Sequence, residues 1–160
     1  TIIVYPLVFV IFPRLWAVDQ IARENIGIAT FADWWGYKWE AWDAIPWNAV
    51  MAMRHGVRVA IKSDSDDFMR RLNQEAAKTM RYGGATEDEA IRMITINPAW
   101  IIGVDDKTGS IDVGKDADLV LWDGYPLSSY GVPEKVWIDG DLFFDRTQAG
   151  LGMPRYREGQ

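Results

Sequence analysis

Cysteine is absent from this chain of 160 residues, and histidine occurs only once, at His55. The absence of cysteine excludes a disulfide framework, thiolate metal ligands and a thiol nucleophile. Imidazole is the commonest general base and metal ligand near neutral pH, so a histidine-rich site would have to borrow residues from elsewhere. A lone histidine cannot complete a metal shell, and we interpret His55, at a helix-to-strand turn, as structural or solvated.

Positive charge is also scarce, with 17 Lys and Arg against 23 Asp and Glu, which gives a net charge of −6. The chain lacks the broad positive field that holds nucleic acid through its phosphates, so we expect no nucleic-acid partner. The longest apolar run, Thr1 to Phe12, is shorter than the ~20 residues that span a bilayer. We expect a buried strand there and no membrane partner. The sequence leaves the cellular location open.

Apolar and aromatic residues are plentiful, at 49% hydrophobic residues with nine tryptophans. This composition excludes disorder, because so many apolar side chains can bury enough surface to offset the chain entropy lost on folding. It fits one folded domain, or a piece of a larger one.

The first two thirds of the chain alternate between helix and strand patterns. This order of elements implies parallel strands. Three signals predict the helices: apolar residues at spacings of three and four, Pro46 at a helix start, and the capping box formed by Thr86 and Glu89. The predicted elements are a helix from Leu15 to Asn25 or Gly27, a strand over 26–32, a helix over 46–55, a strand over 57–62, a helix over 69–83, a helix over 86–97 that breaks at Asn97-Pro98, and one further turn ended by Gly103.

From Gly109 the sequence predicts a small antiparallel β unit of short strands separated by Gly, Asp and Pro. Its best local signal is Asp139-Gly140 between two apolar strands, because a two-residue type I′ turn requires positive φ at both positions. Residues 147–160 show no period and are expected to form a surface tail. The expected strands are 110–113, 119–122, 136–138 and 142–144.

Asp64 is the main candidate for chemistry. Side chains alternate along the strand, so Val57 and Ile61 share one face while Lys62 and Asp64 share the other. Asp64 would then lie at the strand tip, where a parallel barrel holds its active site and a carboxylate can bind a metal and accept the proton of the attacking water. The alternative is that Asp64 caps the helix that follows, which periodicity alone favours.

Four stretches resemble, in collinear order, the carboxyl-terminal part of an amidohydrolase-superfamily enzyme, closest to the imidazolonepropionase and dipeptidase-like branch. The similarity runs from about Ile26 to Arg146. The Asn-Pro-Ala piece and the Gly-Ser-Ile-x-x-Gly-Lys-x-Ala-Asp-Leu-Val piece together make a specific signal. The stretches are Gly56-Val-Arg-Val-Ala-Ile-Lys-Ser-Asp-Ser65, Leu72-Asn-Gln-Glu-Ala-Ala77, Ile94-Thr-Ile-Asn-Pro-Ala99 and Gly109-Ser-Ile-Asp-Val-Gly-Lys-Asp-Ala-Asp-Leu-Val120.

The resemblance implies an α/β fold: a metal-dependent (β/α)₈ barrel beside a small β-sandwich. By position, Asp64 matches the aspartate at the tip of the last barrel strand, the metal ligand and general base. The 31–38 segment matches the preceding strand and its substrate loop. The implied organisation is the last barrel units over 1–103, a sandwich segment over 104–146 and a tail over 147–160. The implied substrate-binding residues are Asp33, Trp34, Trp35 and Tyr37.

The His-x-His pair and the further histidines of such enzymes are missing, and a full barrel takes roughly 250 residues. We therefore expect the end of a larger metal-dependent hydrolase, with a divalent ion, expected to be zinc, in the complete enzyme and none bound by this chain alone. Exposed strand edges predict self-association or pairing with a missing amino-terminal segment. Lys62 would face the interior beside Asp64 and compete with a cation for it.

Two functions remain open at this level. One is hydrolysis of a C–N bond in a cyclic amide or a small peptide-like substrate, through a metal-activated water and with Asp64 as catalytic residue and metal ligand. The other is a catalytically inactive binding or interaction module derived from half of such a fold, with the aromatic loop over 33–43 as its surface. Clustered tryptophans also pack in cores, which is the alternative for Trp34 and Trp35.

Overall fold

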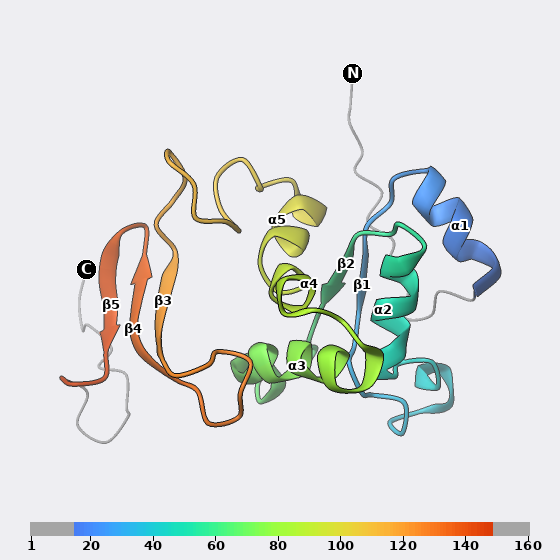
Figure 1. Ribbon diagram of the computed structural model, residues 1–160, viewed down its shortest axis with the longest axis horizontal. Coiled ribbons are helices and arrows are strands. Elements are labelled where there is room, and N and C mark those ends of the chain that lie inside the picture. The colour runs from blue at the N-terminus through green and yellow to red at the C-terminus, as the bar shows by residue number, and fades with distance from the viewer. Residues whose placement is uncertain (1–14, 149–160) are drawn as a thin grey trace.

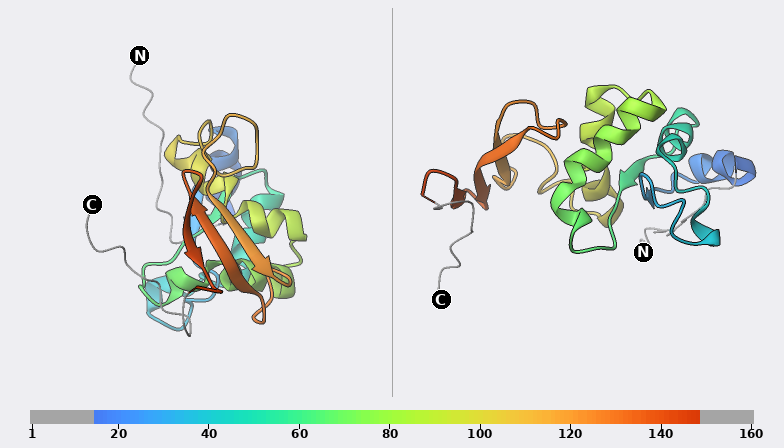
Figure 2. Two further views of the ribbon diagram at one scale, coloured as in Figure 1. Left: turned by 90° about the vertical axis from the view of Figure 1, so that its left-hand side faces the viewer. Right: turned by 90° about the horizontal axis from the view of Figure 1, so that it is seen from below.

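A computed structural model describes residues 15–148 of the chain, and it divides into a helical part around two parallel strands and a separate three-stranded sheet (Figure 1). The sheet stands at one end of the long axis, and the view from below shows it apart from the helices (Figure 2, right). The strand predicted for residues 1–12 and most of the predicted tail lie outside the described residues.

The two strands β1 (Ile28–Thr30) and β2 (Val59–Ile61) pair in parallel, as the order of the predicted elements implied. Ile28 lies opposite Val59, and Thr30 lies opposite Ile61. The connection runs through the helix α2 (Pro46–Arg54), which follows an aromatic loop and the short 3-10 helix η1 (Trp39–Ala41). The pair therefore forms one strand-helix-strand unit, with the helix α1 (Leu15–Arg23) ahead of it.

One face of this strand pair packs against the helices. Ile28, Val59 and Ile61 are buried together with Val18 of α1 and Ala52 of α2. This confirms that alternate residues of β2 share an apolar face that packs on helices. Since β1 and β2 are in register, Phe31 and Lys62 continue the opposite face.

Local chemistry predicts the end of α3 and the start of α4, two of the helix boundaries that follow β2. The 3-10 helix η2 (Phe68–Arg71) leads into α3 (Leu72–Gly83), which ends at Gly84 with a φ of 75°. The Thr86 side chain and Glu89 form the predicted capping box of α4 (Glu87–Arg92). Only glycine adopts such a positive φ without strain, so the Gly84 stop is encoded locally.

The helix break predicted at Asn97-Pro98 is wrong by a few residues. α4 ends at Arg92, and α5 (Ile96–Ile102) begins before the proline and ends at Gly103. Pro98 stands in the first turn of α5, where backbone N–H groups lack helical partners, so its missing N–H costs nothing. The Asn97 side chain donates to the Val59 carbonyl at 2.8 Å, and the Met93 carbonyl accepts from Ile61 N–H at 2.9 Å.

These two bonds cover the edge of β2 that faces away from β1. The expected exposure of strand edges is therefore corrected for β2, whose backbone groups at Val59 and Ile61 are bound by the α4–α5 connection. The described residues form two strand-helix units of a mixed α/β fold, and no closed barrel is formed within residues 15–148.

The carboxyl-terminal sheet is antiparallel, with the order β3-β4-β5. Its strands are β3 (Leu119–Asp123), β4 (Val132–Ile138) and β5 (Asp141–Asp145). The turn between β4 and β5 has a φ of 52° at Asp139 and 83° at Gly140, as the type I′ prediction requires. The loop between β3 and β4 docks on α3, where Leu127 is buried and the Pro126 carbonyl accepts from Asn73 at 2.7 Å.

The strand predicted over 110–113 is wrong. This segment is a loop, and Ile111 and Val113 are fully exposed. Polar contacts fold it locally: Ser110 Oγ donates to Asp112 at 2.5 Å, and Lys115 Nζ donates to Ser110 Oγ at 2.6 Å. The spacing of short segments between Gly, Asp and Pro predicted a strand here, but side-chain hydrogen bonds within the segment hold it as a loop.

Candidate functional site

Two acidic residues lie beyond the same edge of the parallel strand pair. Thr30 and Ile61 are paired in register at the carboxyl ends of β1 and β2. Asp33 follows Thr30, and Asp64 follows Ile61, at the same distance along the chain. Because the carboxyl ends of parallel strands meet at one edge, the fold brings both predicted acids to one end of the unit.

Lys62 binds Asp64 at this edge. The Lys62 Nζ donates to both carboxylate oxygens of Asp64, at 2.9 and 2.8 Å. The lysine side chain is only 13% exposed, whereas that of Asp64 is 56% exposed. Lys62 Nζ also lies 4.0 Å from the ring centroid of Phe31. The predicted competition between Lys62 and a cation for Asp64 thus has a geometric basis.

Asp64 does not cap the turn that follows it. The Ser65 N–H donates to Ser63 Oγ at 3.1 Å, and the Asp67 N–H donates to Ser65 Oγ at 3.3 Å. These serine hydroxyls bind the backbone groups that a capping aspartate would have served. The carboxylate of Asp64 is directed to Lys62 instead.

The donor set at this edge does not fit a metal ion by itself. Within residues 15–148, no group of three or more His, Cys, Asp or Glu side chains is arranged to hold one. A divalent ion needs several such ligands, and the one carboxylate at the β2 tip is bound by an ammonium group. His55 lies at the opposite end of β2, where its Nδ1 is 2.8 Å from Asp19 Oδ1 and its side chain is 44% exposed.

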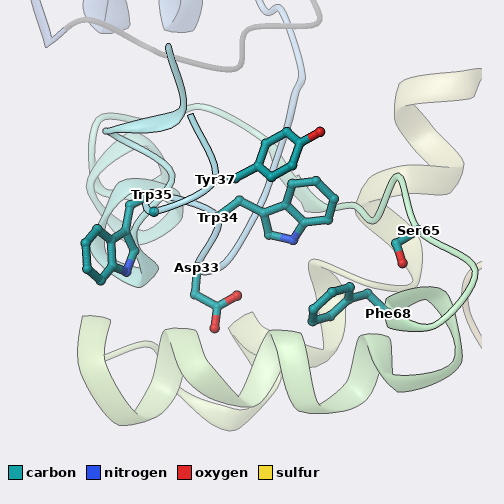
Figure 3. Close-up of a pocket in the computed structure, with 7 residues that line it drawn as sticks. Asp33, Trp34, Trp35, Tyr37, Ser65 and Phe68 are labelled. Atoms are coloured by element: carbon teal, nitrogen blue, oxygen red, sulfur yellow. The ribbon is translucent and has the colours of Figure 1, made fainter. Parts of the chain in front are cut away.

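A pocket of about 460 Å³ opens beside Asp33 (Figure 3). Its lining includes all four residues that the resemblance implied for the substrate end, together with three that the sequence did not single out. Ser65 and Phe68 come from the loop and 3-10 helix after β2, so the pocket joins the segments that follow the two strands. The lining residues are Asp33, Trp34, Trp35, Gly36, Tyr37, Ser65 and Phe68.

Phe68 and Ser65 could have been suspected from topology. If two strands are parallel neighbours, the segments after them meet, so 65–68 must approach 33–37. No motif marks Phe68, since a single apolar residue after an acidic turn has no period. Its place in the pocket is a result of tertiary packing.

Trp34 is the central ring of the pocket. It stacks on Phe31, with ring centroids 4.4 Å apart and an interplanar angle of 12°. Tyr37 and Phe68 meet it edge-on, at 5.3 and 5.7 Å. Trp34 also packs on the small core cluster of Phe31 and Ala41, so pocket lining and core packing both apply to it. Three other tryptophans of the loop, Trp35, Trp39 and Trp42, are exposed, as is Trp47 in the first turn of α2.

The carboxylate of Asp33 is anchored from below by α3. Lys78 Nζ donates to Asp33 Oδ2 at 2.7 Å and to Glu75 Oε1 at 2.6 Å. Glu75 is buried, at 4% exposure. Burial lowers the pKa of Lys78, but its hydrogen bonds to Asp33 and Glu75 outweigh that effect, so the pKa is raised and the lysine stays charged.

Residues 47–143 match the Amidohydrolase family, and this chain therefore belongs to that family. Among curated proteins, it is 36% identical over 119 residues to the amidohydrolase tasK of Hapsidospora irregularis, covering 74% of this chain and 12% of that protein. It is 35% identical over 101 residues to an imidazolonepropionase of Thermoplasma volcanium, covering 58% of this chain and 25% of that protein. The chain thus spans a quarter or less of these two relatives.

Solved structures agree with this assignment. An amidohydrolase from Thermotoga maritima MSB8 is 33% identical, with a TM-score of 0.75 over 82% of this chain and 34% of that one. An adenosine deaminase from Xanthomonas campestris with bound zinc shares the fold, with a TM-score of 0.61 at 22% identity. The described elements are therefore those of about one third of an amidohydrolase fold.

Proposed function

We propose that this chain forms part of an amidohydrolase that cleaves a C–N bond in a cyclic amide or a peptide-like substrate. The observation that carries the proposal is the position of Asp64 at the carboxyl-terminal edge of the parallel strands, next to the pocket lined by Asp33 and Trp34. In barrel enzymes this edge holds the reacting groups, whereas the opposite edge serves stability.

In this proposal the Asp64 carboxylate accepts the proton of the attacking water, and the pocket holds the substrate beside it. Lys62 donates to both Asp64 oxygens, which leaves each oxygen a further lone pair for the water. The family implies a divalent metal, with zinc as the expected ion. The described residues do not form its site, so any metal would need ligands from outside residues 15–148.

The test is a chimera in which residues 15–148 replace the matching third of the Thermotoga maritima amidohydrolase, assayed on a panel of cyclic amides and dipeptides. We expect Asp64→Asn to lower the rate of hydrolysis by about 100-fold or more, because an amide cannot accept the proton. Asp67→Asn makes the same change in charge on an exposed residue of the same loop and should leave the rate nearly unaltered.

Equal rates in the parent chimera and the Asp64→Asn chimera would remove Asp64 from the reaction. A chimera that folds, as judged by circular dichroism, but hydrolyses nothing on the panel would overturn the proposed hydrolysis.

A second candidate is a binding module without catalytic activity. It is favoured by one observation, the occupation of both Asp64 oxygens by the largely buried Lys62. Lys62→Met separates the two functions. In an enzyme this substitution should alter hydrolysis by the chimera, whereas a binding module should hydrolyse nothing with either residue and should keep its binding of ligands in the aromatic pocket.

A further inference from the structure

We propose that the aromatic pocket binds an organic cation of the alkylammonium class, with Asp33 as its counter-charge. The pocket combines the rings of Trp34, Trp35, Tyr37 and Phe68 with a single carboxylate and a hydroxyl, and none of its lining residues is basic. As a statement about the substrate, this inference rests on the proposed function, but cation binding can be measured on the chain itself.

The ring geometry suits a cation. Trp34 meets Tyr37 at an interplanar angle of 61° and Phe68 at 60°, so both neighbouring rings are steeply inclined to the plane of Trp34. Figure 3 shows Tyr37 and Phe68 on either side of Trp34, and the Asp33 carboxylate between Trp35 and Phe68 with one oxygen directed toward the helix below. Rings inclined to one another present several negative faces to one ligand, which is how aromatic cages hold quaternary ammonium groups.

The charged group below the pocket has a net negative charge, which favours a cationic ligand. Asp33, Glu75 and Lys78 form one linked group, in which two carboxylates share one ammonium and leave a net charge of −1. Lys78 reaches this group from α3, below the pocket, and holds the Asp33 carboxylate at the pocket wall. An anionic ligand would meet uncompensated negative charge here, whereas a cationic ligand would neutralise it.

The same aromatic group already attracts cations of the chain. Lys62 Nζ lies 4.0 Å from the centroid of Phe31, the ring on which Trp34 stacks. Lys38 Nζ lies 6.0 Å from the centroid of Tyr37. These internal contacts show that ammonium groups are accommodated beside this ring system.

The experiment titrates choline into the full chain and follows its N-methyl protons by NMR, with calorimetry for the affinity. The neutral control is 3,3-dimethylbutan-1-ol, which has the shape of choline without its charge. We expect saturable choline binding with an upfield shift of the N-methyl protons from the surrounding rings, and binding of the neutral analogue about tenfold weaker.

Matched variants locate the site. Asp33→Asn should weaken choline binding about five- to tenfold, whereas Asp43→Asn, the same change on an exposed acid of the same loop, should leave it within about twofold. Tyr37→Leu should reduce the upfield shift, and Trp39→Leu, at a ring outside the pocket, should not. Tyr37 and Trp39 are 71% and 82% exposed, so neither change should prevent folding.

Three results would overturn the inference: no saturable binding of choline below roughly 50 mM, equal affinity for the neutral analogue, or equal losses in Asp33→Asn and Asp43→Asn. The proposed hydrolysis and the cation site can fail independently. Choline binding with an inactive chimera would leave the cation site standing, whereas a chimera that hydrolyses neutral and cationic substrates equally would keep hydrolysis and reject the cation site.

Discussion

The two regions of the molecule are built from similar residues but differ in burial. In the helical part, Ile28, Val59 and Met93 are completely buried. In the three-stranded sheet, no residue of β3, β4 or β5 is buried, and Leu121 and Phe143 are 46% and 69% exposed. The sheet is held by its backbone ladder and by one docked loop, whereas the helical part is held by a core.

This difference shows that strands can pair into a sheet without burying their apolar side chains. A sheet with apolar side chains on exposed faces is an incomplete layer in a domain of ordinary architecture. The chain covers only 34% of the Thermotoga maritima amidohydrolase, and the match extends over both regions. We expect the exposed sheet to be the part whose stability depends most on partners outside the described residues.

The largest expected effect is a cavity in the helical part. Ile28→Ala should lower the free energy of unfolding by about 3–4 kcal/mol, because Ile28 is fully buried among α1, α2 and β2. Leu121→Ala in the sheet should cost less than about 1 kcal/mol, because half of that side chain is already in water. Urea unfolding measures both, and similar losses would contradict the contrast between the regions.

The next effect comes from the buried charge group. Lys78→Met should destabilise the chain by about 3 kcal/mol, because it leaves the Glu75 carboxylate buried without its ammonium partner. Adding Glu75→Leu to this variant should restore most of the loss. In the sheet, Arg146→Met removes an exposed pair with Asp123 and should cost about 0–1 kcal/mol. Thermal unfolding of the four proteins distinguishes the two kinds of pair.

The smallest expected effect is on how the free energy of unfolding changes at acid pH. Hydrogen bonding to Arg54 and to the Thr86 backbone lowers the pKa of Glu89 from 4.5 to about 2. A carboxylate with a depressed pKa contributes stability that is present above about pH 4.5 and is lost as the pH falls toward 2. Glu89→Gln should therefore flatten the acid side of the stability curve and cost about 1 kcal/mol at neutral pH, the usual loss for a helix cap.

Amide exchange between pH 3 and 6 checks this prediction region by region. Glu89→Gln should change the exchange of α4 and leave that of β5 unaltered. At β5, hydrogen bonds from Thr147 lower the pKa of Asp145. Asp145→Asn should therefore change the amide exchange of β5 and leave that of α4 unaltered. A change that spreads equally over both regions would show that they unfold as one unit.

Local signals were sufficient for most of the elements. Pro46 at the start of α2, Gly84 at the end of α3 and the capping box of Thr86 are each decided by neighbours in sequence. They were predictable because a cap or a positive φ depends on a few adjacent residues. The strand prediction for residues 110–113 also rested on a local signal, the segment between turn residues. It was wrong because the polar side chains of this segment bind one another and no partner strand pairs with it among the described residues.

The residues of the candidate site likewise fall into those that the sequence could predict and those that only the fold brings together. Asp33, Trp34, Trp35 and Tyr37 share one loop, so a single resemblance could point to all four. Ser65 and Phe68 join them only because β1 and β2 lie side by side, and Lys78 reaches Asp33 only because α3 lies below the loop. Such contacts between segments distant in sequence leave no periodic trace.

The sequence by itself determined the order of helices and strands, the parallel pairing, the family resemblance and the shortage of metal ligands, because these follow from composition, periodicity and motifs. Only the tertiary structure decided that Lys62 binds Asp64, that Asn97 covers the edge of β2, and that a buried Glu75–Lys78 pair anchors Asp33 beneath an aromatic pocket. The physical reason is that charge pairing and burial depend on distances across the fold, which residue spacing along the chain does not specify.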